Sequence, residues 1–201
     1  MTTEENKKYG KRLIFIDFDS TLMNSPEPLE GKEIWKEKKG EDYPHIGWWS
    51  KTESLDPDVF DIKPFPKLME IITKEIHDSD SYVIILTNRM SKLRPEIEKL
   101  LALNNIQVDE LDMKEKNRMT KGDRIMTYVE KDEDVTEVSV YDDRANELHD
   151  LMTIASDLEK RDIKYTVFKA DHGILTPIHE GKTVNEVINS EIEDFLEKNN
   201  N

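Results

Sequence analysis

The sequence contains no cysteine and no long apolar run. Without cysteine, neither a disulfide nor a cysteine-ligated metal site can form. A membrane-spanning helix needs roughly 20 consecutive apolar residues, whereas the apolar runs here are about six residues or shorter. The first eight residues are mostly polar and lead into no apolar stretch suited to a signal peptide. We therefore expect a soluble cytoplasmic protein without membrane contact.

Positive charge is also scarce, because 29 Lys and Arg face 44 Asp and Glu, giving a formal net charge of −15. Proteins that coat nucleic acid need clustered Lys and Arg, so extended coating is not expected. The same charge leaves open an enzyme that grips one terminal phosphate. The length of 201 residues is enough for one stable core, and we expect a single domain over residues 1–201. The oligomeric state stays open.

One stretch stands out, an apolar run over residues 13–16 that ends at Asp17 and Asp19. Such a run reads as a central strand buried on both faces. In open α/β sheets, ligands gather beyond the carboxyl ends of such strands. Two neighbouring carboxylates repel each other, and a hard cation such as Mg²⁺ relieves that repulsion and attracts phosphate. The alternative is a strand that merely ends in a polar turn.

Three further segments have the same character. An apolar strand over residues 82–86 is followed by Thr87 and Arg89, and Lys121 opens a later helix. A strand over residues 138–141 ends in the pair Asp142 and Asp143. The chain order is thus carboxylate pair, threonine, lysine, carboxylate pair. Strand and helix patterns alternate about five times, which predicts a parallel sheet with helices on both faces.

These motifs, in this order, resemble those of the haloacid dehalogenase (HAD) superfamily of phosphohydrolases over residues 12–168. The resemblance implies an α/β, Rossmann-like sheet with strand order 5-4-1-2-3 and helices on both faces. It also implies a small cap-like insertion after the first strand, here residues 24–66. Residues 183–201 are expected to form a C-terminal helix and a frayed tail.

The resemblance also implies roles for the motif residues. Asp17 would be the nucleophile that forms an aspartyl-phosphate, and Asp19 would be the general acid and base. Thr87 would bind a phosphoryl oxygen, and Lys121 would neutralise charge. The Mg²⁺ ligands would be Asp17, the main-chain carbonyl of Asp19, Asp142 and Asp143.

Three details stay open at this point. The third-motif cation is Lys121 or Arg124, and Lys121 is favoured because it lies nearer the helix start. Asp142 and Asp143 should point in opposite directions on an extended strand, so we expect Asp142 to be the direct ligand. Ser20, expected near the substrate, stands where many family members have glycine, so the turn must manage without a glycine-only conformation.

The insertion carries Trp48 and Trp49, which could stack on a nucleobase or pack the insertion onto the core. Arg89 could fork onto a phosphate, and the alternative is a surface arginine at a helix start. The Trp-rich segment resembles the HAD domain of "Swiss Army Knife" RNA-repair-like proteins. Arg89 and the paired aspartates resemble the phosphatase half of polynucleotide kinase-phosphatases.

The combined interpretation is a Mg²⁺-dependent phosphatase whose substrate is a phosphorylated nucleotide or nucleic-acid end. A small-molecule phosphatase or nucleotidase is the alternative, followed by a catalytically silent HAD-fold binding module. The intact set of Asp17, Asp19, Thr87, Lys121 and Asp142 speaks against the silent module. The sequence does not separate 3′- from 5′-phosphates or RNA from DNA.

Overall fold

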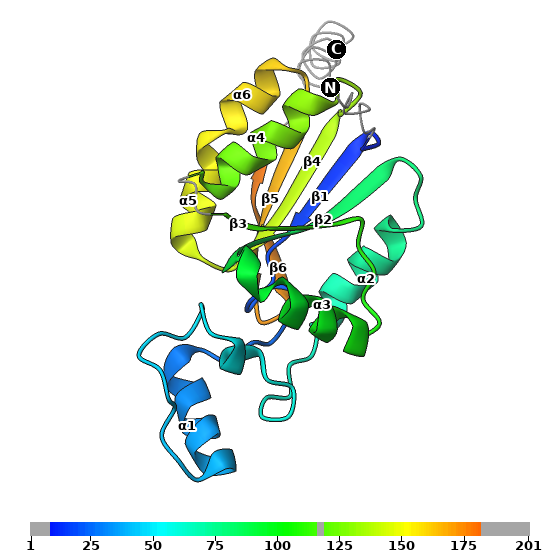
Figure 1. The fold of residues 1–201 in the computed structure, drawn as a ribbon. Coiled ribbons are helices and arrows are strands. Elements are labelled where there is room, and N and C mark those ends of the chain that lie inside the picture. Colours follow the sequence, from blue (N-terminus) through cyan, green and yellow to red (C-terminus); the bar gives the residue numbers. More distant parts are fainter. Residues whose placement is uncertain (1–8, 116–118, 182–201) are drawn as a thin grey trace, which may run out of the picture.

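The computed structural model describes residues 9–115 and 119–181, which form a twisted sheet with helices on both faces (Figure 1). The six strands lie in the order β3-β2-β1-β4-β5-β6. Their bounds are β1 Arg12–Ile16, β2 Ser81–Met90, β3 Glu110–Lys114, β4 Glu137–Asp142, β5 Lys164–Asp171 and β6 Ile174–Glu180. The helices are α1 Pro28–Lys39, α2 Pro66–Glu75, α3 Arg94–Leu103, α4 Lys121–Lys131, α5 Ala145–Thr153 and α6 Ala155–Lys160, with 3₁₀ turns η1 Thr52–Leu55 and η2 Ser91–Leu93.

The expected α/β fold is confirmed, and the first five strands are parallel in the order 5-4-1-2-3. The sixth strand, antiparallel to β5, was not predicted. Its side chains are mostly exposed, and Pro177 interrupts its pattern, as is tolerated on an edge strand. His172 and Gly173, both with positive φ, form the tight turn that joins it to β5.

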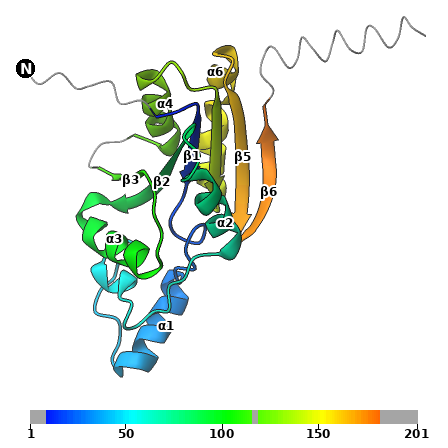
Figure 2. The same ribbon diagram turned by 90° about the vertical axis from the view of Figure 1, so that its right-hand side faces the viewer.

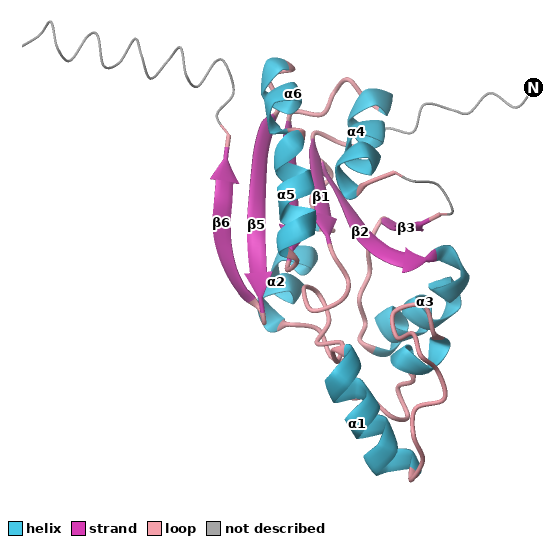
Figure 3. Cartoon of the chain, turned by 90° about the vertical axis from the view of Figure 1, so that its left-hand side faces the viewer, coloured by secondary structure: helices cyan, strands magenta, loops and turns pink. Residues whose placement is uncertain are grey.

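The central strand β1 is buried on both faces because its side chains alternate between two apolar clusters. Leu13 and Phe15 join the cluster formed with α4, α5 and α6. Ile14 and Ile16 join the cluster formed with α2 and α3. Figures 2 and 3 show the two helix layers from opposite sides. In the part of the chain that is described, no helix is long and apolar enough to cross a membrane.

The insertion (residues 24–66) contains α1 and η1 and lies beyond the carboxyl ends of the strands (Figure 1). It does not stand apart, because Trp35, Trp48 and Leu55 belong to the same apolar cluster as α2 and α3. The insertion therefore has a fixed position above the sheet edge. The predicted helix within residues 183–201 lies outside the described residues, which end at Gly181.

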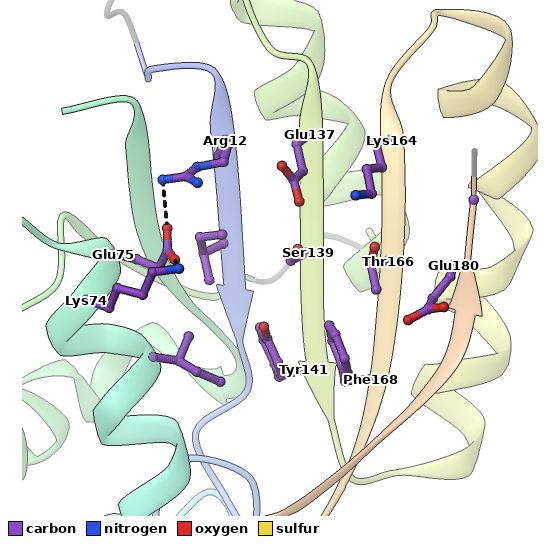
Figure 4. Close-up of a pocket in the computed structure, with 13 residues that line it drawn as sticks. Arg12, Lys74, Glu75, Glu137, Ser139, Tyr141, Lys164, Thr166, Phe168 and Glu180 are labelled. Atoms are coloured by element: carbon purple, nitrogen blue, oxygen red, sulfur yellow. Dashed lines mark ion pairs between the residues drawn. The ribbon is translucent and has the colours of Figure 1, made fainter. Parts of the chain in front are cut away.

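A groove of about 530 Å³ runs along the α2 side of β1, β4 and β5 (Figure 4). Its floor includes the rings of Tyr141 and Phe168, stacked with centroids 4.7 Å apart. Arg12 and Glu75 form an ion pair at its wall. The groove shares no lining residue with the cavity at the carboxyl edge of the sheet. It is a feature of the sheet face, separate from the site described next.

Candidate active site

Six of the ten predicted site residues line one small cavity at the carboxyl edge of the sheet. Asp17 and Asp19 follow β1, Thr87 and Arg89 lie on β2, and Lys121 opens α4. Strand β1 lies between β2 and β4, where the strand order reverses, which is where such sheets bind ligands. The cavity measures about 90 Å³ and is lined by Asp17, Asp19, Trp49, Thr87, Asn88, Arg89, Lys121, Arg144 and Glu147.

Lys121 is the cation that faces the carboxylates. Its buried ammonium lies 2.6 Å from Asp17 Oδ1 and 2.6 Å from Asp142 Oδ2. A capping box formed by Thr120 and Asp123 fixes the start of α4 and hence this lysine. Burial alone would lower the pKa of Lys121, but the two carboxylates hold it above its ordinary value. The ammonium is therefore charged at any neutral pH.

Arg124, the alternative cation, is engaged elsewhere. Its guanidinium pairs with Asp112 at 2.8 Å and donates to the carbonyl oxygen of Thr87 at 3.1 Å. It does not line the cavity. Arg124 thus contacts β2 through the Thr87 carbonyl. Of the two candidate cations, Lys121 is the one that lines the cavity.

Asp17, Asp142 and Asp143 form a group that could hold a metal ion, with one oxygen of each within 4.8 Å of the others. Burial raises the pKa of Asp17 to about 8 against the charge of Lys121, and repulsion from Asp142 adds to the rise. Burial likewise raises the pKa of Asp143 to about 6. When all three are ionised, these carboxylates outnumber the nearby cations, Lys121 and Arg144. Oxygen ligands and that imbalance fit a hard divalent cation such as Mg²⁺.

The expected divergence of Asp142 and Asp143 was wrong. Strand β4 ends at Asp142, so the alternation of side chains does not extend to Asp143. Both carboxylates face Asp17. Asp142 is held by more and shorter hydrogen bonds than Asp143, because its oxygens accept from Lys121 and from the backbone N–H of Arg144. Asp143 accepts a long hydrogen bond of 3.4 Å from Thr21.

Arg89 is not a surface residue; its guanidinium is buried and forks onto Asp19. Its Nε donates to Asp19 Oδ2 at 2.7 Å and its Nη2 to Asp19 Oδ1 at 2.8 Å. Its Nη1 donates to the Ser54 hydroxyl at 2.7 Å and to the Trp49 carbonyl at 3.3 Å. The fork expected for a phosphate is therefore occupied by a carboxylate of the protein itself.

The two tryptophans of the insertion have different surroundings. Trp48 is buried, packs against Tyr43 and Phe60, and donates from its indole nitrogen to the Pro26 carbonyl. A Cβ added at Gly31 would lie 2.1 Å from the Trp48 ring. For Trp48 the structure thus supports the packing alternative.

Trp49 lines the cavity instead. The guanidinium of Arg89 lies 5.1 Å from its ring centroid and that of Arg144 lies 4.7 Å from it. Both contacts are within the range of cation–π attraction. The ring thus lies at the cavity, within cation–π distance of two guanidinium groups.

Ser20 and Thr87 complete the predicted set. Thr87 is buried, lines the cavity, and accepts a hydrogen bond from the backbone N–H of Arg89. Ser20 has φ 56° and donates to Glu27 at 3.4 Å; it does not line the cavity. Its left-handed backbone is accessible to serine at some cost, so the turn forms without glycine.

Four residues of the site received no role from the sequence. Asn88, Arg144 and Glu147 line the cavity, and Ser54 holds Arg89. Asn88 and Arg144 stand inside the predicted motifs, so the motifs themselves were a signal for them. Nothing in the local sequence marks Glu147 or Ser54.

No protein-family model and no curated protein matches the sequence significantly. The structure is similar to a chain in each of two solved Pnkp1/Rnl/Hen1 complexes, one described as an RNA repair complex, with 15% identity and TM-scores of 0.49. The similarity covers 86% of this chain, which spans about half of those chains, 50% and 47%.

A haloacid dehalogenase-like family hydrolase from Streptococcus pneumoniae is similar too, with 13% identity and a TM-score of 0.46 over 79% of this chain and 93% of that one. At these identities the likeness says nothing about activity. The fold class rests on the strand order and helix layers described above.

Proposed function

We propose that this protein is a Mg²⁺-dependent phosphomonoester hydrolase that works through an aspartyl-phosphate at Asp17. One observation carries the proposal: Asp17 lies in a small cavity with Thr87 and Lys121, beside two further carboxylates. A carboxylate nucleophile splits one difficult displacement into two easier ones. The surrounding charges supply what phosphoryl transfer needs, which is positioning and electrostatic stabilisation.

The metal would be held by Asp17, Asp142 and Asp143, whose oxygens and charge imbalance fit it. When bound, it would supply Lewis-acid stabilisation of the phosphoryl oxygens. The protein itself provides a positive charge at Lys121. Its ammonium lies 2.6 Å from an oxygen of Asp17 and 2.6 Å from an oxygen of Asp142. Thr87 offers a hydroxyl at the cavity wall for a phosphoryl oxygen.

Asp19 would transfer the protons. It would protonate the leaving oxygen when Asp17 attacks phosphorus, and later take a proton from the water that hydrolyses the intermediate. Its carboxylate is buried at the cavity, two residues after the nucleophile. Arg89 donates hydrogen bonds to both oxygens of Asp19 and would fix the orientation of this carboxylate.

Phosphorylated nucleotides or nucleic-acid ends are the proposed substrates. A cavity of about 90 Å³ has room for a phosphoryl group, so the rest of the substrate would lie at its mouth. Trp49, which lines the cavity, would serve as the aromatic platform. A stacked base would displace the Arg144 guanidinium from the ring, since four hydrogen bonds hold that of Arg89.

The test is an assay of the purified protein with p-nitrophenyl phosphate, nucleotides, and oligonucleotides carrying a 3′- or 5′-phosphate. We expect Mg²⁺-dependent phosphate release from all classes, with the highest kcat/KM for one of the nucleotide substrates. Equal or higher kcat/KM for small sugar or alkyl phosphates would favour the small-molecule alternative. Absence of release from every ester would contradict the phosphatase and leave the silent binding module.

A further inference from the structure

The catalytic end of the sheet and the insertion are joined through one buried serine. Ser54 lies on η1 with no exposed surface. Its hydroxyl donates to the Lys51 carbonyl at 2.7 Å and accepts a hydrogen bond from Arg89 Nη1 at 2.7 Å. Arg89 in turn forks onto Asp19. A continuous chain of hydrogen bonds therefore runs from the insertion to the carboxylate beside the proposed nucleophile.

From this geometry we infer that Ser54 is a positioning residue for Asp19, acting through Arg89. The inference rests on the proposed function, because it assigns Ser54 a part in the proton transfer that Asp19 would perform. It makes the insertion a component of the acid–base machinery in addition to any contact it makes with substrate. The insertion would have to break the Arg89–Ser54 contact if it swung away from the sheet.

The physical reason is that a flexible arginine can fix a carboxylate only if its own guanidinium is fixed. Two of the guanidinium's hydrogen bonds go to Asp19, and the other two go to the insertion, at the Ser54 hydroxyl and the Trp49 carbonyl. The Trp49 ring adds a contact at 5.1 Å. Small displacements of a catalytic group reduce rates steeply. The hydrogen bonds from Arg89 to Ser54 and Trp49 should therefore affect how well Arg89 positions Asp19.

The step that Ser54 would influence is the first transfer. A carboxylate oxygen of Asp17 attacks phosphorus, the bond from phosphorus to the leaving oxygen breaks, and the proton of Asp19 moves to that oxygen. Water then attacks phosphorus, the bond to Asp17 breaks, and a water proton returns to Asp19. An alkoxide leaves poorly without that proton, whereas p-nitrophenolate leaves readily without it.

The experiment compares kcat/KM for an alkyl phosphate and for p-nitrophenyl phosphate in the wild type and in Ser54→Ala. We expect about a tenfold loss for the alkyl ester and at most about a twofold loss for the aryl ester. Both esters are measured on one preparation, so a smaller folded fraction lowers both values equally and leaves their ratio unchanged. Partial unfolding therefore cannot produce the expected result.

Thr52→Ala is the matched control, because Thr52 is an exposed hydroxyl on the same turn whose partner is the neighbouring Glu53. It should leave both values unchanged. Asp19→Asn should show the same preference for the aryl ester as Ser54→Ala, only larger. Adding Ser54→Ala to Asp19→Asn should change neither ester further, since the two residues act in one chain.

An equal loss for both esters in Ser54→Ala would overturn the inference while leaving the phosphatase intact. Full additivity of Ser54→Ala and Asp19→Asn would overturn it as well, by showing that Ser54 acts apart from Asp19. A wild type that hydrolyses neither ester would contradict the proposed function itself, and the inference with it. The two failures are thus distinguishable from the wild-type measurement alone.

Discussion

The two sides of the cavity differ in how their negative and positive side chains are balanced. On the sheet side, Lys121 bridges Asp17 and Asp142, and a third carboxylate, that of Asp143, lies close to both. On the insertion side, one guanidinium meets one carboxylate, Arg89 on Asp19, and its remaining hydrogen bonds go to neutral groups. The first side is short of positive charge and suits a cation and a phosphoryl group. The second side is neutral and suits the positioning of a side chain.

The largest change should come from replacing Asp17, the proposed nucleophile on the sheet side. Asp17→Asn keeps the size of the side chain but cannot form an aspartyl-phosphate, so we expect at least about a hundredfold loss of turnover. Steady-state phosphate release is the measurement. Turnover above about a hundredth of the wild-type value would count against covalent catalysis, provided that the variant's circular dichroism matches that of the wild type.

Removal of the metal tests whether the three carboxylates of the sheet side need a bound cation. Chelation should stop activity, Mg²⁺ should restore it, and Ca²⁺ should support it poorly, because Ca²⁺ prefers more ligands and looser geometry. Phosphate release after dialysis against a chelator and stepwise addition of each ion is the measurement. Full activity in the chelator would remove the cation from the mechanism.

Variants of Trp48 and Trp49 test the role of the insertion side. Trp49→Ala should lower kcat/KM for nucleotide substrates about five- to a hundredfold, since stacking contributes roughly 1–3 kcal/mol per base, and should affect p-nitrophenyl phosphate much less. Trp48→Ala should instead lower the free energy of unfolding by about 3–5 kcal/mol and reduce activity on all substrates together. The adjacent variants are each other's control. Equal behaviour of the two would contradict the distinction between platform and packing residue.

A further effect should appear in the pH dependence of stability. Without metal, the pKa of Asp17 is about 8 in the folded protein against 3.8 for an unperturbed carboxyl. Between those values the folded state holds a proton that the unfolded chain has lost, so raising the pH should lower the free energy of unfolding. Asp17→Asn should flatten this part of the profile, and Mg²⁺ should flatten it in the wild type. Chemical denaturation at about pH 5 and about pH 8 in a chelator is the measurement.

The sequence predicted the sheet side far better than the insertion side. The apolar runs of β1, β2 and β4 are unambiguous, and each ends in the side chains that the site uses. The order of these strands came from the resemblance, since periodicity gives no order. Strand β6 escaped notice because an exposed edge buries too little to leave a pattern.

The contacts of the insertion could not be read from the chain. Arg89 and Asp19 are 70 positions apart, and Ser54 lies 35 positions from Arg89, so only the tertiary fold joins them. Trp48 and Trp49 are neighbours in sequence, yet the turn of the backbone sends one into the core and the other to the cavity. Asp142 and Asp143 converge because the strand ends between them.

The measurement that tests the central claim most directly is the trapping of a phosphoenzyme. Asp19→Asn should still react at Asp17 with p-nitrophenyl phosphate, whose leaving group needs no acid, but should lack the base for hydrolysis. We predict a burst of p-nitrophenol equal to the enzyme concentration, and an acyl phosphate that peptide mass spectrometry locates on Asp17. No burst and no adduct in this variant, or an adduct that persists when Asp17→Asn is added, would contradict the account.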